Sequence, residues 1–284
     1  MTTDDAELRF AAQLRMFLAP RHRAGRVRVT CDGTSTLGHV VESFGVPLTE
    51  VGALRVGALS DGSAGGSRPV PPGHRLADGE TVTVSAMTRP QPLDKARFLL
   101  DVHLGTLARR LRLLGIDTAY ANDRDDDTLI EEANAGHRAL LTRDRGLLCR
   151  RRLWLGAYVR GDDPDGQLRD VLDRFAPLLA PWTRCTTCNG TLEPVPKADV
   201  EALLEPGTRR TYDSFARCAN CDRVYWRGAH GGRLAAIVDS AEEIVAASRS
   251  GSRGPNFSGL PLPVYRPVPG SPGRIPGWPC CGGG

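Results

Sequence analysis

Two C-x2-C pairs form the pattern in this chain that most clearly indicates chemistry. Cys185 and Cys188 make up the first pair, and Cys218 and Cys221 make up the second, with 29 residues between the pairs. Two such turns deliver four thiolates to one tetrahedral ion, and zinc is the metal that this ligand set favours. Two redox pairs or free thiols are the alternative. We predict a structural zinc site, because four cysteines leave no open coordination position for catalysis.

Acidic side chains follow apolar runs in the middle of the chain. Asp101 closes the run RFLL, Asp144 follows the run ALLT, and Asp126 opens a predicted helix. The carboxyl ends of parallel strands lie at one edge of a sheet, so Asp101 and Asp144 are expected to converge there. Convergent carboxylates repel one another unless a hard cation such as Mg²⁺ or Mn²⁺ lies between them. Such an ion activates water and stabilises the charge on a phosphodiester under attack.

These acids also have ordinary structural explanations. Asp126 could cap its helix, and the acids that flank it could form a solvated turn. The positions of Asp101 and Asp144 after apolar strands are harder to explain in this way, because a buried acid costs desolvation energy unless something binds it.

Arginines surround the predicted acidic cluster and could attract a phosphate backbone. We expect Arg109, Arg112 and Arg143 to contact the substrate. Arg143 is next to Asp144 and is well placed to clamp a phosphate or pair with a carboxylate. A solvated arginine face on an amphipathic helix is the alternative, and it is the preferred interpretation for Arg110.

The elements that position these residues divide the chain into four parts. Residues 96–182 alternate strand, helix and strand, which predicts an α/β domain with a parallel sheet of right-handed crossovers. Residues 6–88 indicate a small α+β domain, and its order of two strands, a helix and further short strands resembles the ubiquitin-like β-grasp. Residues 183–235 are expected to form the cysteine module, with a short helix in KADVEALL. Residues 251–284 are rich in Gly and Pro and are predicted to be a disordered tail.

Composition sets outer limits on function. The net charge is +4, which permits nucleic acid as a partner without demanding it. No run approaches the roughly 18 apolar residues that a transmembrane helix needs. The N-terminal residues lack the basic and apolar regions of a signal peptide. We therefore expect a cytoplasmic protein whose cysteines bind metal rather than form disulfides.

The segments FLLDVHLGTLARRLRLLGID and DDTLIEEANAGHRALLTRDRGLL resemble the RNase domain first described at the C-terminus of the Mut-seven exonuclease. That family is a branch of the PilT N-terminal (PIN-like) nuclease superfamily. The similarity continues through CTTCNGTLEPVPK and RCANCDRVYWRGAH, which resemble the zinc ribbon of the same family. Many bacterial members carry a ubiquitin-like domain in front, which matches residues 6–88.

This resemblance implies a metal-dependent ribonuclease that cleaves RNA with Mg²⁺ or Mn²⁺ and carries a structural Zn²⁺. Asp101, Asp126 and Asp144 match the acidic positions of the superfamily. A fourth acid is often present, and Asp162 or Asp163 could supply it here.

The competing hypothesis is a non-catalytic RNA-binding or adaptor protein. In that case the zinc ribbon and the arginines bind RNA or a partner, and the β-grasp domain docks to another protein. Tyr225 and Trp226 could stack on bases or pack against the zinc knuckle.

Overall fold

The computed structural model describes residues 5–58, 67–228 and 231–251. The predicted tail, 251–284, lies outside these ranges apart from Gly251, which is the last residue of a helix. None of the helices in the described ranges combines the length and apolar character that crossing a bilayer requires.

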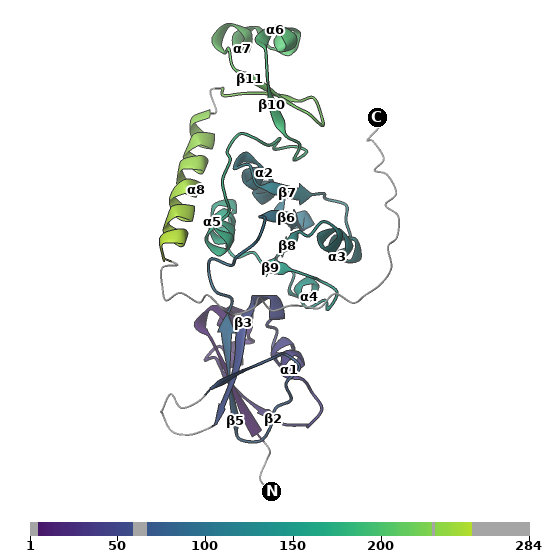
Figure 1. Ribbon diagram of the computed structural model, residues 1–284, viewed down its shortest axis with the longest axis vertical. Coiled ribbons are helices and arrows are strands. Elements are labelled where there is room, and N and C mark those ends of the chain that lie inside the picture. The colour runs from purple at the N-terminus through teal and green to yellow at the C-terminus, as the bar shows by residue number, and fades with distance from the viewer. Residues whose placement is uncertain (1–4, 59–66, 229–230, 252–284) are drawn as a thin grey trace. The chain divides into compact units, whose positions relative to one another are not determined.

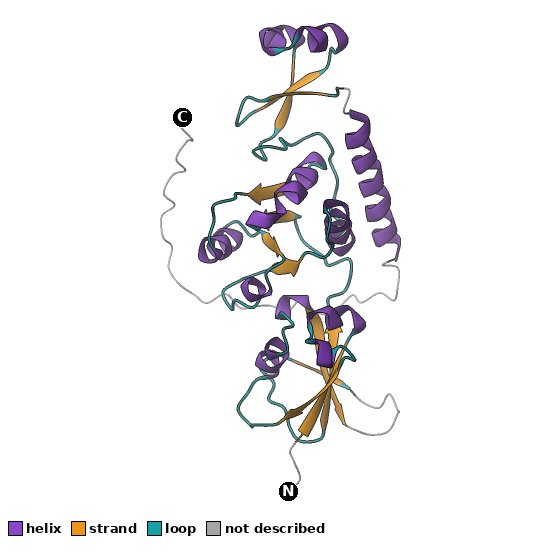
Figure 2. Ribbon diagram, turned by 180° about the vertical axis from the view of Figure 1, so that it is seen from behind, coloured by secondary structure: helices purple, strands orange, loops and turns teal. Residues whose placement is uncertain are grey.

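The N-terminal part is a mixed five-stranded sheet with a helix against it (Figures 1 and 2). In spatial order its strands are β2 (Arg26–Thr30), β1 (Asp5–Phe10), β5 (Glu80–Ala86), β3 (Val51–Ala58) and β4 (Arg68–Val70). Its helical segments are η1 (Ala12–Phe17), η2 (Pro20–His22), α1 (Leu37–Ser43) and η3 (Leu48–Glu50). β1 and β5 pair in parallel, and alternate residues of β1 are buried. The predicted ubiquitin-like α+β fold is confirmed.

The middle of the chain is a four-stranded parallel sheet, as predicted. The strands are β6 (Arg97–Leu100), β7 (Asp117–Tyr120), β8 (Ala139–Thr142) and β9 (Gly156–Tyr158), in the order β7-β6-β8-β9. The helical connections are η4 (Val102–Leu104), α2 (Gly105–Leu113), α3 (Asp126–Ala135) and α4 (Arg145–Leu148), and α5 (Pro164–Phe175) follows β9. Because helices cover both faces, the central strands β6 and β8 are mostly buried, apolar runs, whereas the edge strand β7 is more polar.

The pleat of β6 divides its side chains between two cores. Phe98 and Leu100 pack with α2 and α5, whereas Leu99 packs with α3 and α4. A long helix that the sequence analysis did not predict, α8 (Gly231–Gly251), adds Val238 and Ala241 to the first core. Its buried residues Val238, Ala241 and Val245 recur at helical spacing, with Ile237 and Ile244 beside them, so periodicity does indicate this helix.

The cysteine module is a three-stranded antiparallel sheet. Its strands are β10 (Leu192–Val195), β11 (Phe215–Cys218) and β12 (Val224–Trp226). Between β10 and β11 lie α6 (Lys197–Val200), η5 (Glu201–Leu203) and α7 (Pro206–Thr211), which confirms the helix predicted there. The apolar core of the module is formed by Val200, Leu204 and Phe215. A core this small needs a further restraint to be stable, and a metal ion is a common one.

A buried ion pair joins the β-grasp domain to the α/β domain. Glu50 at the end of η3 is 1% exposed, and its carboxylate lies 2.5 Å from the guanidinium of Arg174, which is 2% exposed. The same carboxylate accepts a hydrogen bond from the backbone N–H of Tyr158. Arg174 also donates to Gln91. Buried charges are tolerated when they are paired and hydrogen-bonded, so this contact fixes how the two domains meet.

Candidate functional site

The strand order places a topological switch point between β6 and β8. From β6 the chain first crosses to β7 on one side, and later crosses to β8 and β9 on the other. Ligands of open α/β sheets bind outside the carboxyl ends of the strands at such a point. Asp101 and Asp144 follow the carboxyl ends of β6 and β8, and therefore lie at the expected place.

Asp101 is a buried acid that lacks a basic partner within the described ranges. It is 8% exposed, and it forms no ion pair with any residue described there. Its N–H continues the β6–β8 ladder to Leu141, and its Oδ2 accepts a hydrogen bond of 2.7 Å from the hydroxyl of Thr142. One hydroxyl is weak compensation for a buried carboxylate.

Asp144 is linked to Asp101 through Thr142. The hydroxyl oxygen of Thr142 accepts a hydrogen bond of 2.9 Å from the N–H of Asp144. Oδ1 of Asp144 caps α4 by accepting from the N–H groups of Gly146 and Leu147. The side chain is exposed and forms no ion pair within the described ranges. The cap fixes the carboxylate in place and leaves Oδ2 for a ligand.

Asp126 lies apart from this pair. The cap of α3 is Asp125, which accepts from the N–H of Thr128, so the alternative that Asp126 caps the helix is wrong. Asp126 is the first helical residue, half exposed, with a carboxylate oxygen 4.0 Å from Arg150. Asp101, Asp126 and Asp144 do not form a close metal-ligand group. Over the ranges that the structure describes, four cysteines form the only such group.

The acids after β9 are held by their own loop. Asp163 caps α5 by accepting from the N–H groups of Asp165 and Gly166. Asp162 is fully exposed and lies 3.1 Å from the guanidinium of Arg143, which also donates to the carbonyl of Gly161.

The three predicted substrate arginines differ in exposure. Arg143 is part exposed at the carboxyl edge, and Arg109 on α2 is exposed without an ion pair in the described ranges. Arg112 is 4% exposed, so the structure corrects its predicted contact with substrate. It donates to the carbonyl oxygens of Thr118, Thr186 and Thr187, which ties α2 to the first cysteine turn. The apolar spacing of α2 could not reveal that carbonyl groups from a distant turn surround this position.

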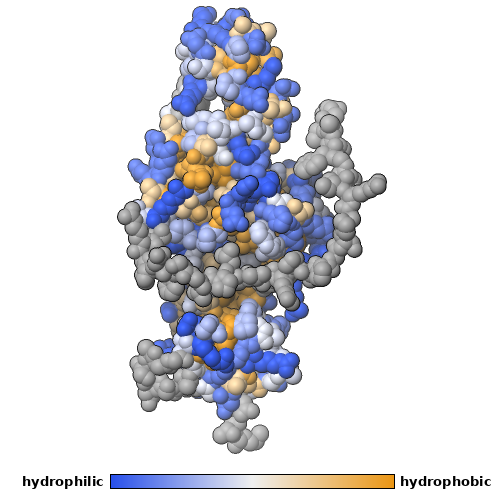
Figure 3. All heavy atoms as spheres, in the orientation of Figure 1, coloured by the Kyte–Doolittle hydropathy of each residue, from blue (hydrophilic) through white to orange (hydrophobic). Residues whose placement is uncertain are grey.

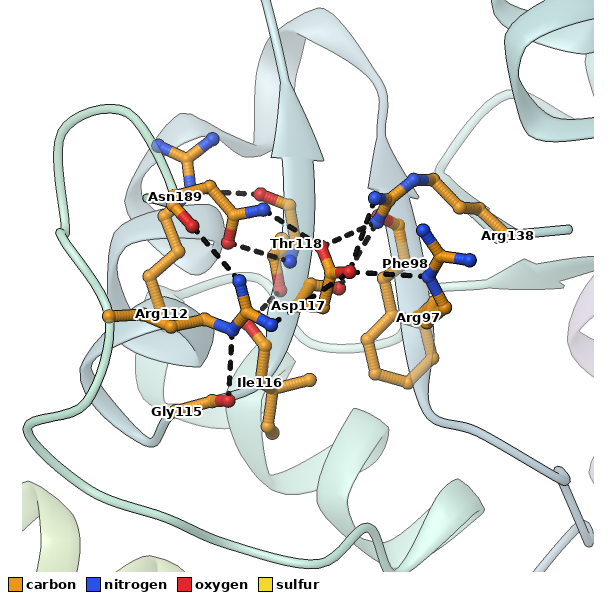
Figure 4. Close-up of polar contacts among 10 residues, drawn as sticks. Arg97, Phe98, Arg112, Gly115, Ile116, Asp117, Thr118, Arg138 and Asn189 are labelled. Carbon is orange, nitrogen blue, oxygen red and sulfur yellow. Dashed lines mark hydrogen bonds and ion pairs between the residues drawn. The ribbon is translucent and has the colours of Figure 1, made fainter. Parts of the chain in front are cut away.

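At the opposite, amino-terminal edge of the sheet, Asp117 is the centre of a charged network (Figure 4). Its carboxylate forms ion pairs with Arg97, Arg138 and Arg184. It also accepts a hydrogen bond of 2.8 Å from the side-chain amide of Asn189, the residue after Cys188. The amide oxygen of Asn189 accepts in turn from the N–H of Thr118. The network docks the cysteine module onto the α/β domain.

The pKa of Asp117 is set by these arginine and Asn189 contacts. Burial raises the pKa of Asp117, but hydrogen bonds from Arg138 and Asn189 outweigh it and bring the pKa to about 2. The sequence analysis did not identify this residue. Its partners Arg184 and Asn189 lie more than 60 residues further along the chain, so local sequence does not reveal the network.

The four cysteine sulfurs converge as predicted. All four lie within 4.8 Å of one another, with 3.7 Å between Cys185 and Cys221 and 3.4 Å between Cys188 and Cys218. Tetrahedral zinc with Zn–S bonds of about 2.3 Å separates its sulfurs by roughly 3.8 Å, so the group fits one ion. The N–H of Cys188 points to Sγ of Cys185, and the N–H of Asn220 points to Sγ of Cys218, which stabilises thiolates.

Tyr225 belongs to this centre. Burial raises the pKa of the Cys185 thiol, but hydrogen bonds from the Tyr225 hydroxyl, 2.9 Å away, and from the Cys188 and Thr187 backbone together outweigh it and lower the pKa to about 6. Tyr225 therefore packs on the knuckle. Trp226 is 43% exposed and lies beside Phe215, so its indole face is partly open to solvent.

The chain combines three parts. A ubiquitin-like domain comes first, a parallel α/β domain with acids at its switch point follows, and a ribbon with four clustered cysteines comes after it. The model of the Mut7-C RNAse domain matches residues 96–238, and that of the Mut7-C ubiquitin domain matches residues 3–92. The first match covers more than half of the 284 residues, and the chain belongs to the Mut7-C RNAse domain family. No curated protein and no solved structure matches it significantly.

We expect Cys218→Ser to abolish stable binding of the structural metal ion, because one of the four thiolates is lost. The measurement is metal content per chain by mass spectrometry after gel filtration. Cys149→Ser is the control, since Cys149 lies outside the cluster. Equal metal content in both variants would contradict the assignment of the four cysteines as ligands.

We expect Asp117→Asn to lower the free energy of unfolding at pH 7 by about 2 kcal/mol. The folded pKa of Asp117 is depressed to about 2, so its contribution is complete above the unfolded pKa of about 3.9 and declines as the pH falls towards 2. The difference between wild type and variant in urea unfolding should therefore shrink below about pH 4. Any loss of metal in acid affects wild type and variant alike, so it cancels in the comparison. A difference in the free energy of unfolding that grows as the pH falls would contradict this account.

Proposed function

We propose that the chain is a metal-dependent ribonuclease whose site is the carboxyl edge of β6 and β8. The observation that carries the proposal is Asp101, a buried carboxylate at the switch point with no basic partner in the described ranges. A structural acid in this position is normally paired, because desolvation of a lone carboxylate costs several kcal/mol. Family membership in the Mut7-C RNAse domain supports the same chemistry.

Asp101 and Asp144 are the residues that would hold Mg²⁺ or Mn²⁺. Magnesium commonly uses one or two carboxylates, keeps several waters and takes its remaining ligands from substrate phosphate. Two acids joined through Thr142 fit this requirement without a tight group of three or four. When bound, the ion would lower the pKa of a water and stabilise charge on the phosphate. Asp126 at the rim would act on waters rather than on the ion directly.

The residues around this pair have supporting roles in the proposal. Arg143 and Arg109 would hold the phosphate backbone, which positions RNA without selecting its sequence. The four-cysteine group would bind Zn²⁺ in a purely structural role, because it lies on the cysteine module that docks at the opposite edge of the sheet. The hydrolytic site and the thiolate site are thus separate in chemistry and in place.

We expect Asp101→Asn and Asp144→Asn each to reduce RNA cleavage by roughly 100-fold or more, because each removes a carboxylate that would hold the cation, and the cation stabilises the negative charge of the transition state. The measurement is cleavage of labelled single-stranded and structured RNAs with Mg²⁺, Mn²⁺ or neither. Asp213→Asn is the matched control, since Asp213 is an exposed acid of the cysteine module. An unchanged midpoint of urea unfolding shows that the variants are folded.

A wild-type protein that binds these RNAs but leaves them intact with either metal would overturn the proposal. The non-catalytic RNA-binding or adaptor function would then be the correct one.

A further inference from the structure

A strongly basic segment borders the β-grasp domain. Residues 11–31 contain five arginines and no Asp or Glu. We call Arg15, Arg21, Arg23, Arg26 and Arg28 the arginine strip. All five are exposed, and none forms an ion pair with an acid in the described ranges. Elsewhere in the described chain many arginines are paired, so this concentration of unneutralised charge is unusual for the molecule.

The strip follows one edge of the β-grasp sheet. β2, which carries Arg26 and Arg28, is an edge strand. The guanidinium of Arg15 lies against Gly25, so that η1 brings a third positive charge to the start of β2. On the neighbouring strand, Arg9 is directly opposite Arg26. Arg9 itself pairs with Glu7, which lies opposite Arg28, so the neighbouring strand brings one acid and one further arginine to this edge.

The other side of η1 contacts the α/β domain next to Asp144. Arg145, the residue after Asp144, donates to the carbonyl oxygens of Phe17 at 3.0 Å and Met16 at 3.5 Å. The ring of Phe17 packs edge-on against Tyr158 at the end of β9. One short helix therefore connects the strip to the carboxyl edge of the sheet.

The chemistry of the strip favours a polyanion with regularly spaced charges. Figure 3 shows strongly hydrophilic residues beside apolar ones on the visible face of the β-grasp domain, at the lower end of the view. Charged side chains on an edge strand discourage addition of a further strand from a peptide. Phosphate groups, by contrast, accept the parallel N–H groups of guanidinium in a bidentate manner.

We propose that the arginine strip binds the phosphate backbone of RNA as it enters the acidic edge. This inference rests on the proposed function, since it assigns the RNA substrate a second contact on the β-grasp domain. The β-grasp domain then contributes affinity for long RNA, and the α/β domain cleaves it. Contacts of this kind act equally in the ground state and the transition state, so they lower KM without changing kcat.

The test compares two double variants of the full chain that remove the same charge. Arg26→Gln with Arg28→Gln changes the strip, and Arg68→Gln with Arg75→Gln changes exposed arginines of the same domain outside it. Binding of a labelled 20-nucleotide RNA is measured against salt in an Asp101→Asn background, which prevents cleavage. The strip variant should flatten the slope of log K against log salt by about 1.4, or 0.7 for each lost phosphate contact.

Cleavage kinetics give a second, independent readout in the catalytically intact chain. The strip variant should raise KM for the long RNA several-fold with kcat unchanged, and it should leave cleavage of a trinucleotide unaffected. If strip and control variants bind alike while wild type cleaves RNA, the strip proposal is overturned and the ribonuclease stands. If wild type neither binds nor cleaves RNA, both proposals fail. If the strip binds an acidic protein instead of RNA, the strip and control variants will bind RNA alike while wild type still cleaves it.

Discussion

The parallel pairing of β6 with β8 is the constraint on which the candidate site depends. Crossovers through α2 and α3 return the chain to the same edge, so that Asp101 and Asp144 come together although 42 residues separate them. Thr142 then completes the arrangement, since its hydroxyl donates to one acid and accepts from the backbone of the other. A shift of β8 by one residue would turn Thr142 to the other face and remove the link.

The opposite edge has a complementary, purely structural chemistry. Asp117 pairs with three arginines there and accepts a hydrogen bond from Asn189, so the sheet holds the cysteine module next to its four-cysteine group. Among the described residues, Asp101 and Asp144 at one edge form no ion pair, although Asp162 beside them pairs with Arg143, whereas Asp117 at the other edge pairs with three arginines. This contrast is the physical basis for assigning reaction chemistry to the first edge and scaffolding to the second.

Much of this architecture could be predicted from local sequence. The C-x2-C spacing indicated the four-cysteine group, and apolar runs followed by acids indicated the parallel sheet and its carboxyl edge. The structural role of Arg112 could not be predicted, because its partners are carbonyl groups from a turn more than 70 residues away. Helix α8 was missed although it was predictable, since Val238, Ala241 and Val245 recur at helical spacing between the cysteine module and the Gly/Pro-rich tail. The cytoplasmic location and the roles of the acids stay predictions.

The central claim, that Asp101 and Asp144 share a divalent cation, is tested most directly by a crystal structure grown with Mn²⁺. Anomalous scattering identifies manganese without any assumption about activity, and the four-cysteine group serves as an internal reference for a second metal. We predict a manganese peak beside both carboxylates in the wild type and its loss in Asp101→Asn. An ordered carboxyl edge with no peak, in crystals whose thiolate site is filled, would contradict the account.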